Sequence, residues 1–187
     1  MNSPIDIRTL SGSSVFAVAL LFALSFSTNI VFAQMAPEPD RGGFTFLINF
    51  GPGYQTDVIG GGAVGFGGLN LGVGDFLKED LAVLIRLSAT HAEHESIFAN
   101  QVAGVAGATL QYWLKRGIYL EGGMGIGFAT RDLERGLQLG VGVLVGTGIT
   151  VFNRRKNNVH VGVEYTPAFL VGESVHNLGF KVGYQLL

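Results

Sequence analysis

Hydrophobic residues alternate with small or polar residues along most of the chain beyond residue 42. In the segment 118–130, the even-numbered Ile118, Leu120 and Ile126 share one face, while Glu121, Gly123, Gly125 and Gly127 share the other. A period of two residues indicates a β-strand, because successive side chains of a strand point to opposite faces. The chain is therefore predicted to consist of strands with one large apolar face and one small or polar face.

Charged and turn residues divide this alternation into eight segments. Each segment is long enough for a tilted membrane strand, which needs ~9–11 residues. The second and fourth segments alternate less clearly, because Gly or Ala stands on both of their faces. We predict strands at 43–54, 62–74, 81–91, 100–114, 118–130, 136–152, 158–170 and 175–186.

The composition decides which face points outward. Charged residues make up 14% of the chain, against ~25% in an average soluble domain. Inside the predicted strands they are only Arg86, Glu121, Glu164 and Lys181. An apolar outer belt with charge between the strands fits a lipid-facing barrel, and closure of the barrel satisfies every backbone hydrogen bond. The predicted fold is all-β, an eight-stranded antiparallel up-and-down transmembrane β-barrel.

The first 33 residues have the three-part pattern of a secretory signal peptide. An uncharged apolar run at 15–26 is followed by Val31 and Ala33, at positions −3 and −1 before Gln34. A retained N-terminal anchor is the alternative. The chain has no Cys, so an exported form would have no disulfides. We expect a signal peptide at 1–33, a short N-terminal tail at 34–42 and the barrel at 43–187.

An even strand number places both termini on one side, which is the periplasmic side in this architecture. The periplasmic connections would then be 74–80, 115–117 and 153–158. The outer connections would be 55–61, 92–99, 131–135 and 171–174, which are short for extracellular loops.

Aromatic residues gather near the strand ends, as in the aromatic girdles of membrane barrels. The alternative is the general enrichment of aromatic residues in strands. The band expected at the periplasmic end comprises Phe44, Tyr112, Trp113, Tyr119, Phe152 and Tyr184, and the band at the outer end comprises Phe98, Phe128, Tyr165 and Phe169.

The strand number, the alternation and the terminal segment LGFKVGYQLL (178–187) resemble the OmpA/OmpX-like superfamily of small outer-membrane barrels. Members of that superfamily typically end in Phe, whereas this segment ends in Leu187. The resemblance implies a bacterial outer-membrane location, insertion by the barrel-assembly machinery, and contact with outer-membrane lipid and lipopolysaccharide. It also implies a lumenal salt-bridge cluster, which plugs the pore in related barrels.

By alternation, Arg86, Glu121, Glu164 and Lys181 all point into the lumen. Their formal charges sum to zero, and a lone buried charge costs several kcal/mol unless it is paired. We therefore expect a lumenal charge network in the periplasmic half of the barrel. It would act as a polar core that plugs the lumen, and the alternative is a gate or an ion path.

Two further groups of residues offer metal-binding or catalytic chemistry. His91 and His94, with His176 from the last outer connection, are weak candidates for a metal such as Zn²⁺. Glu173, Ser174 and His176 supply the residue types of a hydrolytic site. They do not reproduce the His-x-Ser arrangement of lipid A-modifying barrels. We expect a solvated loop, no metal, no cofactor and no catalysis.

The favoured function is a non-catalytic structural or interaction role in the outer membrane, with a plugged lumen. The alternative is a narrow pore for ions or small solutes. A lipid A-modifying enzyme and a soluble lipocalin-like ligand binder are less favoured. A net charge of −2 gives no attraction to nucleic acid, and no feature indicates an oligomeric state. The basic turn Arg154-Arg155-Lys156 is expected to be solvated or to touch anionic lipid or a periplasmic partner.

Overall fold

The computed structural model describes residues 41–57, 62–94, 99–114, 117–131 and 136–187. The expected signal peptide and nearly all of the tail at 34–42 lie outside the described residues. Within the described part of the chain, no helix has the length and hydropathy that a membrane span requires.

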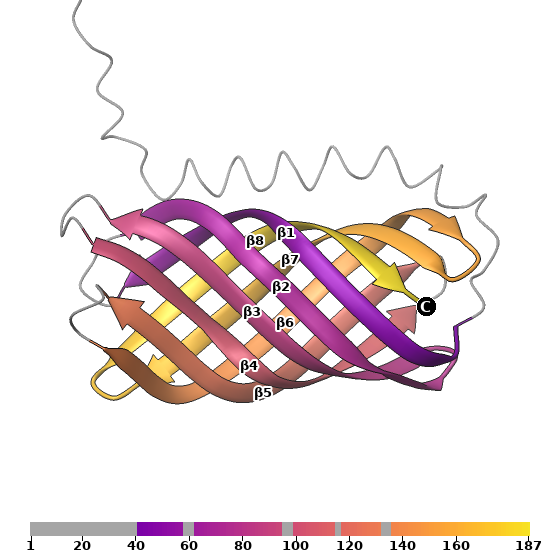
Figure 1. The fold of residues 1–187 in the computed structure, drawn as a ribbon, viewed down its shortest axis with the longest axis horizontal. Coiled ribbons are helices and arrows are strands. Elements are labelled where there is room, and N and C mark those ends of the chain that lie inside the picture. The colour runs from indigo at the N-terminus through magenta and orange to yellow at the C-terminus, as the bar shows by residue number, and fades with distance from the viewer. Residues whose placement is uncertain (1–40, 58–61, 95–98, 115–116, 132–135) are drawn as a thin grey trace, which may run out of the picture. The chain divides into compact units, whose positions relative to one another are not determined.

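The described residues form a closed barrel of eight strands, in which each strand pairs antiparallel with the next and β1 pairs with β8 (Figure 1). This confirms the predicted fold class. Half of the strand ends lie one to four residues beyond the predicted ends, and nearly all of the others coincide with them. Their bounds are β1 Gly43–Asp57, β2 Gly62–Lys78, β3 Leu81–His94, β4 Ala99–Leu114, β5 Ile118–Arg131, β6 Leu137–Arg154, β7 Asn157–Leu170 and β8 Glu173–Leu186.

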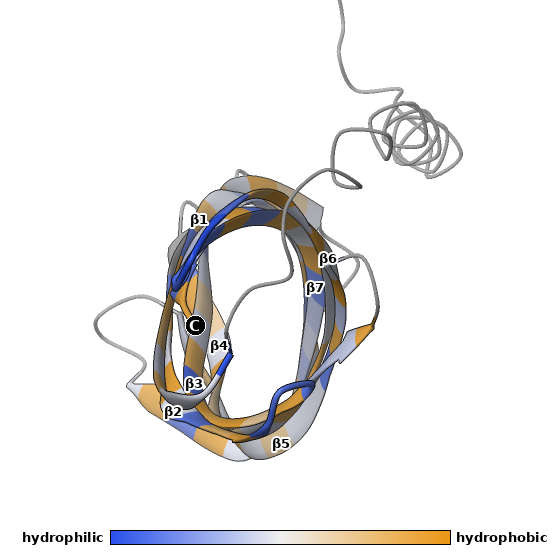
Figure 2. Cartoon of the chain, turned by 90° about the vertical axis from the view of Figure 1, so that its right-hand side faces the viewer, coloured by the Kyte–Doolittle hydropathy of each residue, from blue (hydrophilic) through white to orange (hydrophobic). Residues whose placement is uncertain are grey.

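The two faces of the barrel wall differ as the alternation predicts. Outward-facing Ile126 and Met124 are 57% and 69% exposed, whereas Glu121 on the inner face is buried. Figure 2, which views the barrel from the end where the chain terminates, shows hydrophobic and hydrophilic residues following one another along the strands. The wall therefore presents an apolar surface outward and encloses a polar interior.

The interior changes in character along the barrel axis. At the end that carries the C-terminus, an apolar floor crosses the lumen, and we define it as Phe76, Ala82, Trp113, Tyr119 and Leu187. The opposite end is lined by a second buried apolar cluster of smaller side chains, Ala103, Ala129, Ala168, Leu170 and Val175. Polar and charged side chains fill the space between the two clusters.

Trp113 and Tyr119 correct the aromatic band expected at the periplasmic end. Their side chains are 2% and 5% exposed and lie against each other in the floor, with ring centroids 5.1 Å apart. The prediction rested on their position near a strand end. The alternation of side chains along β4 and β5, however, points both residues into the barrel. Phe44, Tyr112, Phe152 and Tyr184 do face outward. In the outer band, Phe98 lies outside the described residues.

Candidate functional site

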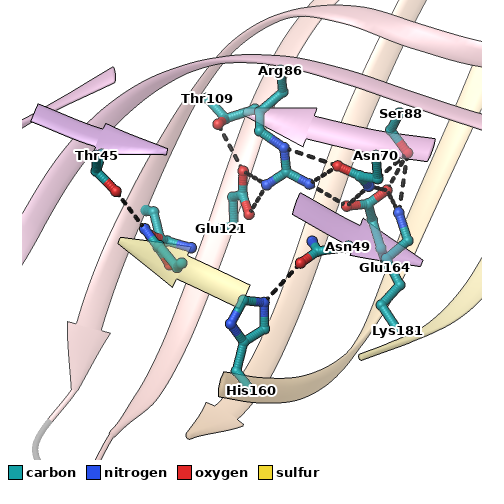
Figure 3. Close-up of polar contacts among 12 residues, drawn as sticks. Thr45, Asn49, Asn70, Arg86, Ser88, Thr109, Glu121, His160, Glu164 and Lys181 are labelled. Atoms are coloured by element: carbon teal, nitrogen blue, oxygen red, sulfur yellow. Dashed lines mark hydrogen bonds and ion pairs between the residues drawn. The ribbon is translucent and has the colours of Figure 1, made fainter. Parts of the chain in front are cut away.

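Four strands supply the charged side chains of the lumen: Arg86 from β3, Glu121 from β5, Glu164 from β7 and Lys181 from β8. All four are 8% exposed or less. The strands are not all neighbours, so the side chains meet across the lumen and not along one pair of strands (Figure 3). The structure brings together the four residues named from the sequence.

Arg86 is the centre of this charge network. Its Nη1 contacts both carboxylate oxygens of Glu121, and its Nη2 lies 2.8 Å from Oε2 of Glu164. The ammonium of Lys181 forms an ion pair with Oε1 of Glu164. Acidic and basic groups thus alternate in one chain, from Glu121 through Arg86 and Glu164 to Lys181, and their formal charges cancel.

Asn70 on β2 connects the two halves of the network. Its side-chain oxygen accepts a hydrogen bond from Nε of Arg86 at 3.2 Å. Its amide nitrogen donates to both carboxylate oxygens of Glu164, at 2.9 and 3.0 Å. The pairing of β2 is irregular beside this residue, with register shifts against both β1 and β3. We attribute the inward reach of Asn70 to this irregularity.

Hydroxyl groups add further hydrogen bonds to both carboxylates. Ser88 donates to Oε1 of Glu164 and accepts from Nζ of Lys181 at 3.1 Å. Thr109 donates to Oε1 of Glu121 at 2.7 Å. A buried ion pair offsets its desolvation only when its remaining donors and acceptors are also bonded. The hydroxyls and Asn70 meet that condition around both acids.

The sequence did not single out Asn70, Ser88 or Thr109. Ser88 shares the parity of Arg86 and could have been placed in the lumen for that reason. Thr109 and Asn70 lie in the two segments with weak alternation, where Gly and Ala hide the parity. All three are uncharged, so the pattern of charged residues within the strands does not include them.

A glycine makes room for the central guanidinium. Gly72 faces the stem of Arg86, and a Cβ at this position would lie 2.5 Å from the Cδ of Arg86. Real Cβ atoms do not approach this closely, so a larger residue would displace the arginine. Part of the glycine content of the inner face therefore follows from the size of the charged side chains that it accommodates.

A second set of polar side chains lies inside the barrel beside the floor. Nε2 of His160 lies 2.9 Å from the side-chain oxygen of Asn49. Nε2 of Gln185 donates to Thr45 at 3.1 Å and to Gln111 at 2.8 Å. Gln111 also accepts from the indole nitrogen of Trp113 at 3.1 Å. This set is therefore hydrogen-bonded to the floor through Gln111 and Trp113.

The histidines named as weak metal candidates are not assembled into a site. His91 is exposed on β3, and His176 lies on β8, with β1 and β2 between these strands. The side chain of His94 lies outside the described residues. Among the side chains that are described, no group of three or more His, Cys, Asp or Glu could hold a metal ion.

Ser174 and His176 lie side by side on the outer face of β8. Oγ of Ser174 is 3.2 Å from Nε2 of His176, and Nδ1 of that ring is 2.7 Å from the hydroxyl of Tyr165. Glu173 alternates with the inward-facing Val175 and Asn177, so it lies on the other face of β8 from this imidazole. The group that orients the ring is a tyrosine and not the carboxylate that the enzyme hypothesis requires.

No protein-family model matches the sequence, and no curated protein matches it. Solved structures do match. Neisserial surface protein A is similar with a TM-score of 0.66 and 16% identity, over 76% of this chain and 96% of that one. Ail, the attachment invasion locus protein of Yersinia pestis, is similar with a TM-score of 0.54 and 14% identity, over 78% of this chain and 99% of that one. This chain therefore has the fold of the small eight-stranded outer-membrane β-barrels, as its resemblance to the OmpA/OmpX-like superfamily implies.

Proposed function

We propose that this protein is a non-catalytic structural or interaction barrel of the bacterial outer membrane, whose lumen is closed to solutes. The observation that carries this proposal is the charge network, because Arg86 and Glu164 join β3, β5, β7 and β8 across the lumen. A conducting pore needs a continuous water path. Bonded side chains occupy that path here.

The floor supports the same function independently. Trp113 and Tyr119 place two large buried aromatic rings at one end of the interior, and Cζ of Arg41 lies 4.5 Å from the Trp113 ring centroid. A cation at this distance from an aromatic face is attracted to it. Solute passage would have to open both the floor and the network, which lie in series.

An outer-membrane location is supported by the outward face, which exposes large apolar side chains on every strand. Its partners would be outer-membrane lipid, lipopolysaccharide and, during insertion, the barrel-assembly machinery. We further propose that the exported protein begins at or near Gln34. Mass spectrometry of the membrane-extracted protein tests this start, and a stable monomeric water-soluble form of 34–187 would contradict the membrane location.

Conductance in planar bilayers tests the closed lumen. The wild-type protein should conduct poorly. Replacing Arg86 and Glu121 together by Ala removes a neutral pair and leaves Glu164 bonded to Lys181, and this change alone should leave the floor closed. Adding Trp113→Ala should raise conductance, because both obstacles are then reduced.

The control for this series is Ile85→Ala with Leu87→Ala, which removes the same kind of bulk from the lipid-facing side of β3. It should leave conductance at the wild-type level. Heat-dependent gel mobility would verify that each variant is folded. A wild-type protein that conducts steadily, with no response to changes in the network or the floor, would overturn the closed lumen and favour the narrow pore.

A further inference from the structure

The turn between β6 and β7 carries three consecutive cations. Arg154 pairs with Asn157, so only Arg155 and Lys156 form the loop, and all three basic side chains are exposed. No acidic residue occurs between Glu134 and Glu164 in the sequence. No acidic side chain therefore lies beside this turn in the sequence, and the backbone contact that the turn receives from the end of β8 comes from Leu187, whose N–H donates to the carbonyl of Lys156 at 2.6 Å.

A β-bulge directs part of this charge toward the membrane. Thr150 pairs with His160, but Phe152 pairs with Val159, so the register shifts by one residue at Val151. A shift of one residue exchanges the two faces of a strand. Without the bulge, Phe152 and Arg154 would point into the lumen, as the even-numbered residues before them in β6 do. With it, both stand on the outer face, where Phe152 is 55% exposed.

The turn also keeps an arginine where glycine is favoured. Arg155 has a φ of 55° at the first position of a two-residue hairpin loop, and it is the only non-glycine residue with positive φ among those that the structure describes. Gly117 and Gly172 hold the positive φ at two of the other connections. L-residues adopt this conformation at an energetic cost. An arginine thus occupies a position where glycine would relieve strain, which points to a role for its charge.

The position of the turn decides what this charge can meet. Val151, Phe152 and Tyr184 are exposed apolar or aromatic residues immediately before the turn or beside it. Such residues mark the edge of the lipid-facing belt. The loop has two residues and cannot extend far beyond that edge. Its cations therefore lie at the depth of lipid headgroups, which favours a lipid over a soluble periplasmic polymer.

We propose that the Arg154-Arg155-Lys156 turn binds the phosphate headgroups of anionic phospholipids. Strand β1 begins and strand β8 ends at this end of the barrel (Figure 1), which is the periplasmic end in this architecture. The ligand belongs to the inner leaflet of the outer membrane, and its chemical class is phosphatidylglycerol or a related anionic phospholipid. Clusters of Lys and Arg at a membrane surface bind such lipids electrostatically.

The β2–β3 hairpin provides a matched control within the same chain. A register shift between Phe76 and Lys78 also turns a cation to the outer face, and Lys78 is exposed. Here, however, Asp75, Glu79 and Asp80 surround the lysine in sequence. The two hairpins share a bulge and an outward cation but differ in net charge, so only the β6–β7 turn should select an anionic lipid.

The test is native mass spectrometry of the folded full-length mature barrel in an uncharged detergent, titrated with phosphatidylglycerol or with phosphatidylcholine. The wild type should bind phosphatidylglycerol preferentially. Affinity should fall about fivefold for each base removed, so that Arg154→Gln, Arg155→Asn and Lys156→Gln together reduce it about a hundredfold. Lys78→Gln should leave it unchanged. Replacing Arg154 and Arg155 by Lys should restore most of the binding lost in the triple variant, because the charge is kept.

Three results would overturn the proposal: equal binding of the two lipids by the wild type, undiminished phosphatidylglycerol binding by the triple variant, or an equal loss with Lys78→Gln. A parallel titration with lipid A separates the two leaflets. If the triple variant loses affinity for lipid A and keeps its affinity for phosphatidylglycerol, the turn faces the wrong leaflet and the assignment fails. Heat-dependent gel mobility verifies the fold of every variant.

Discussion

Residues 85, 86 and 87 of β3 show two opposite environments within one strand. Ile85 and Leu87 face outward and are 61% and 41% exposed, whereas Arg86 between them is 2% exposed. In a water-soluble protein the charge would be outside and the aliphatic side chains inside. The inversion shows that the wall of this barrel separates an apolar outer surface from a polar interior, and that one position along the strand decides which of the two a side chain meets.

The largest loss of stability should come from Arg86→Met on the inner face. It leaves Glu121 and Glu164 buried with only Lys181 to compensate, which should destabilise the folded barrel by ~3–5 kcal/mol. Adding Glu121→Gln removes the excess negative charge and should recover part of that loss. Denaturant unfolding in lipid vesicles, followed by the fluorescence of the single tryptophan, Trp113, measures both effects. Leu87→Met on the opposite face is the control, and an equal loss there would contradict the comparison.

The reverse experiment places a charge on the lipid side. Ile126→Arg should destabilise the inserted barrel by ~2–4 kcal/mol if the site is near the bilayer midplane, because the guanidinium then faces hydrocarbon. Ile126→Val is the matched control and should change little. The same unfolding assay applies. A negligible effect of arginine at this position would mean that the outer face meets water, as in a lipocalin-like barrel.

A smaller loss of stability is expected from a change of side-chain size without a change of charge. The alternation alone predicts that Gly142→Ser on the inner face is mild in comparison with a charge on the outer face. The structure places a Cβ at this position 2.5 Å from a methyl group of Val105. We therefore expect a loss of ~1–3 kcal/mol from overpacking. Val105→Ala, introduced with Gly142→Ser, should relieve it, and a double variant no more stable than Gly142→Ser would contradict steric conflict as the cause.

The strand arrangement was predictable because a half-buried strand carries its orientation in its own sequence. Lys181 and Glu164 could be placed in the lumen by parity alone. Their partners could not be identified in this way, because Arg86 and Glu164 are 78 residues apart and meet only through closure of the ring. Parity also fails where the backbone departs from regular pairing. The bulge at Val151 and the irregular stretch of β2 beside Asn70 reverse or obscure it, and neither has a signal in the side-chain pattern.

Closure of the barrel has a consequence for how the chain folds. The hydroxyl of Thr45 on β1 donates to the carbonyl of Leu186 on β8 at 2.6 Å, across 141 residues of sequence. Contacts between such distant residues form slowly, since loop closure must come first. Lys181 arrives with β8, the last strand in the sequence. Before β8 docks, the charge network holds two acids and one base. The final strand therefore adds its two ladders, with β7 and with β1, together with the charge that neutralises the network.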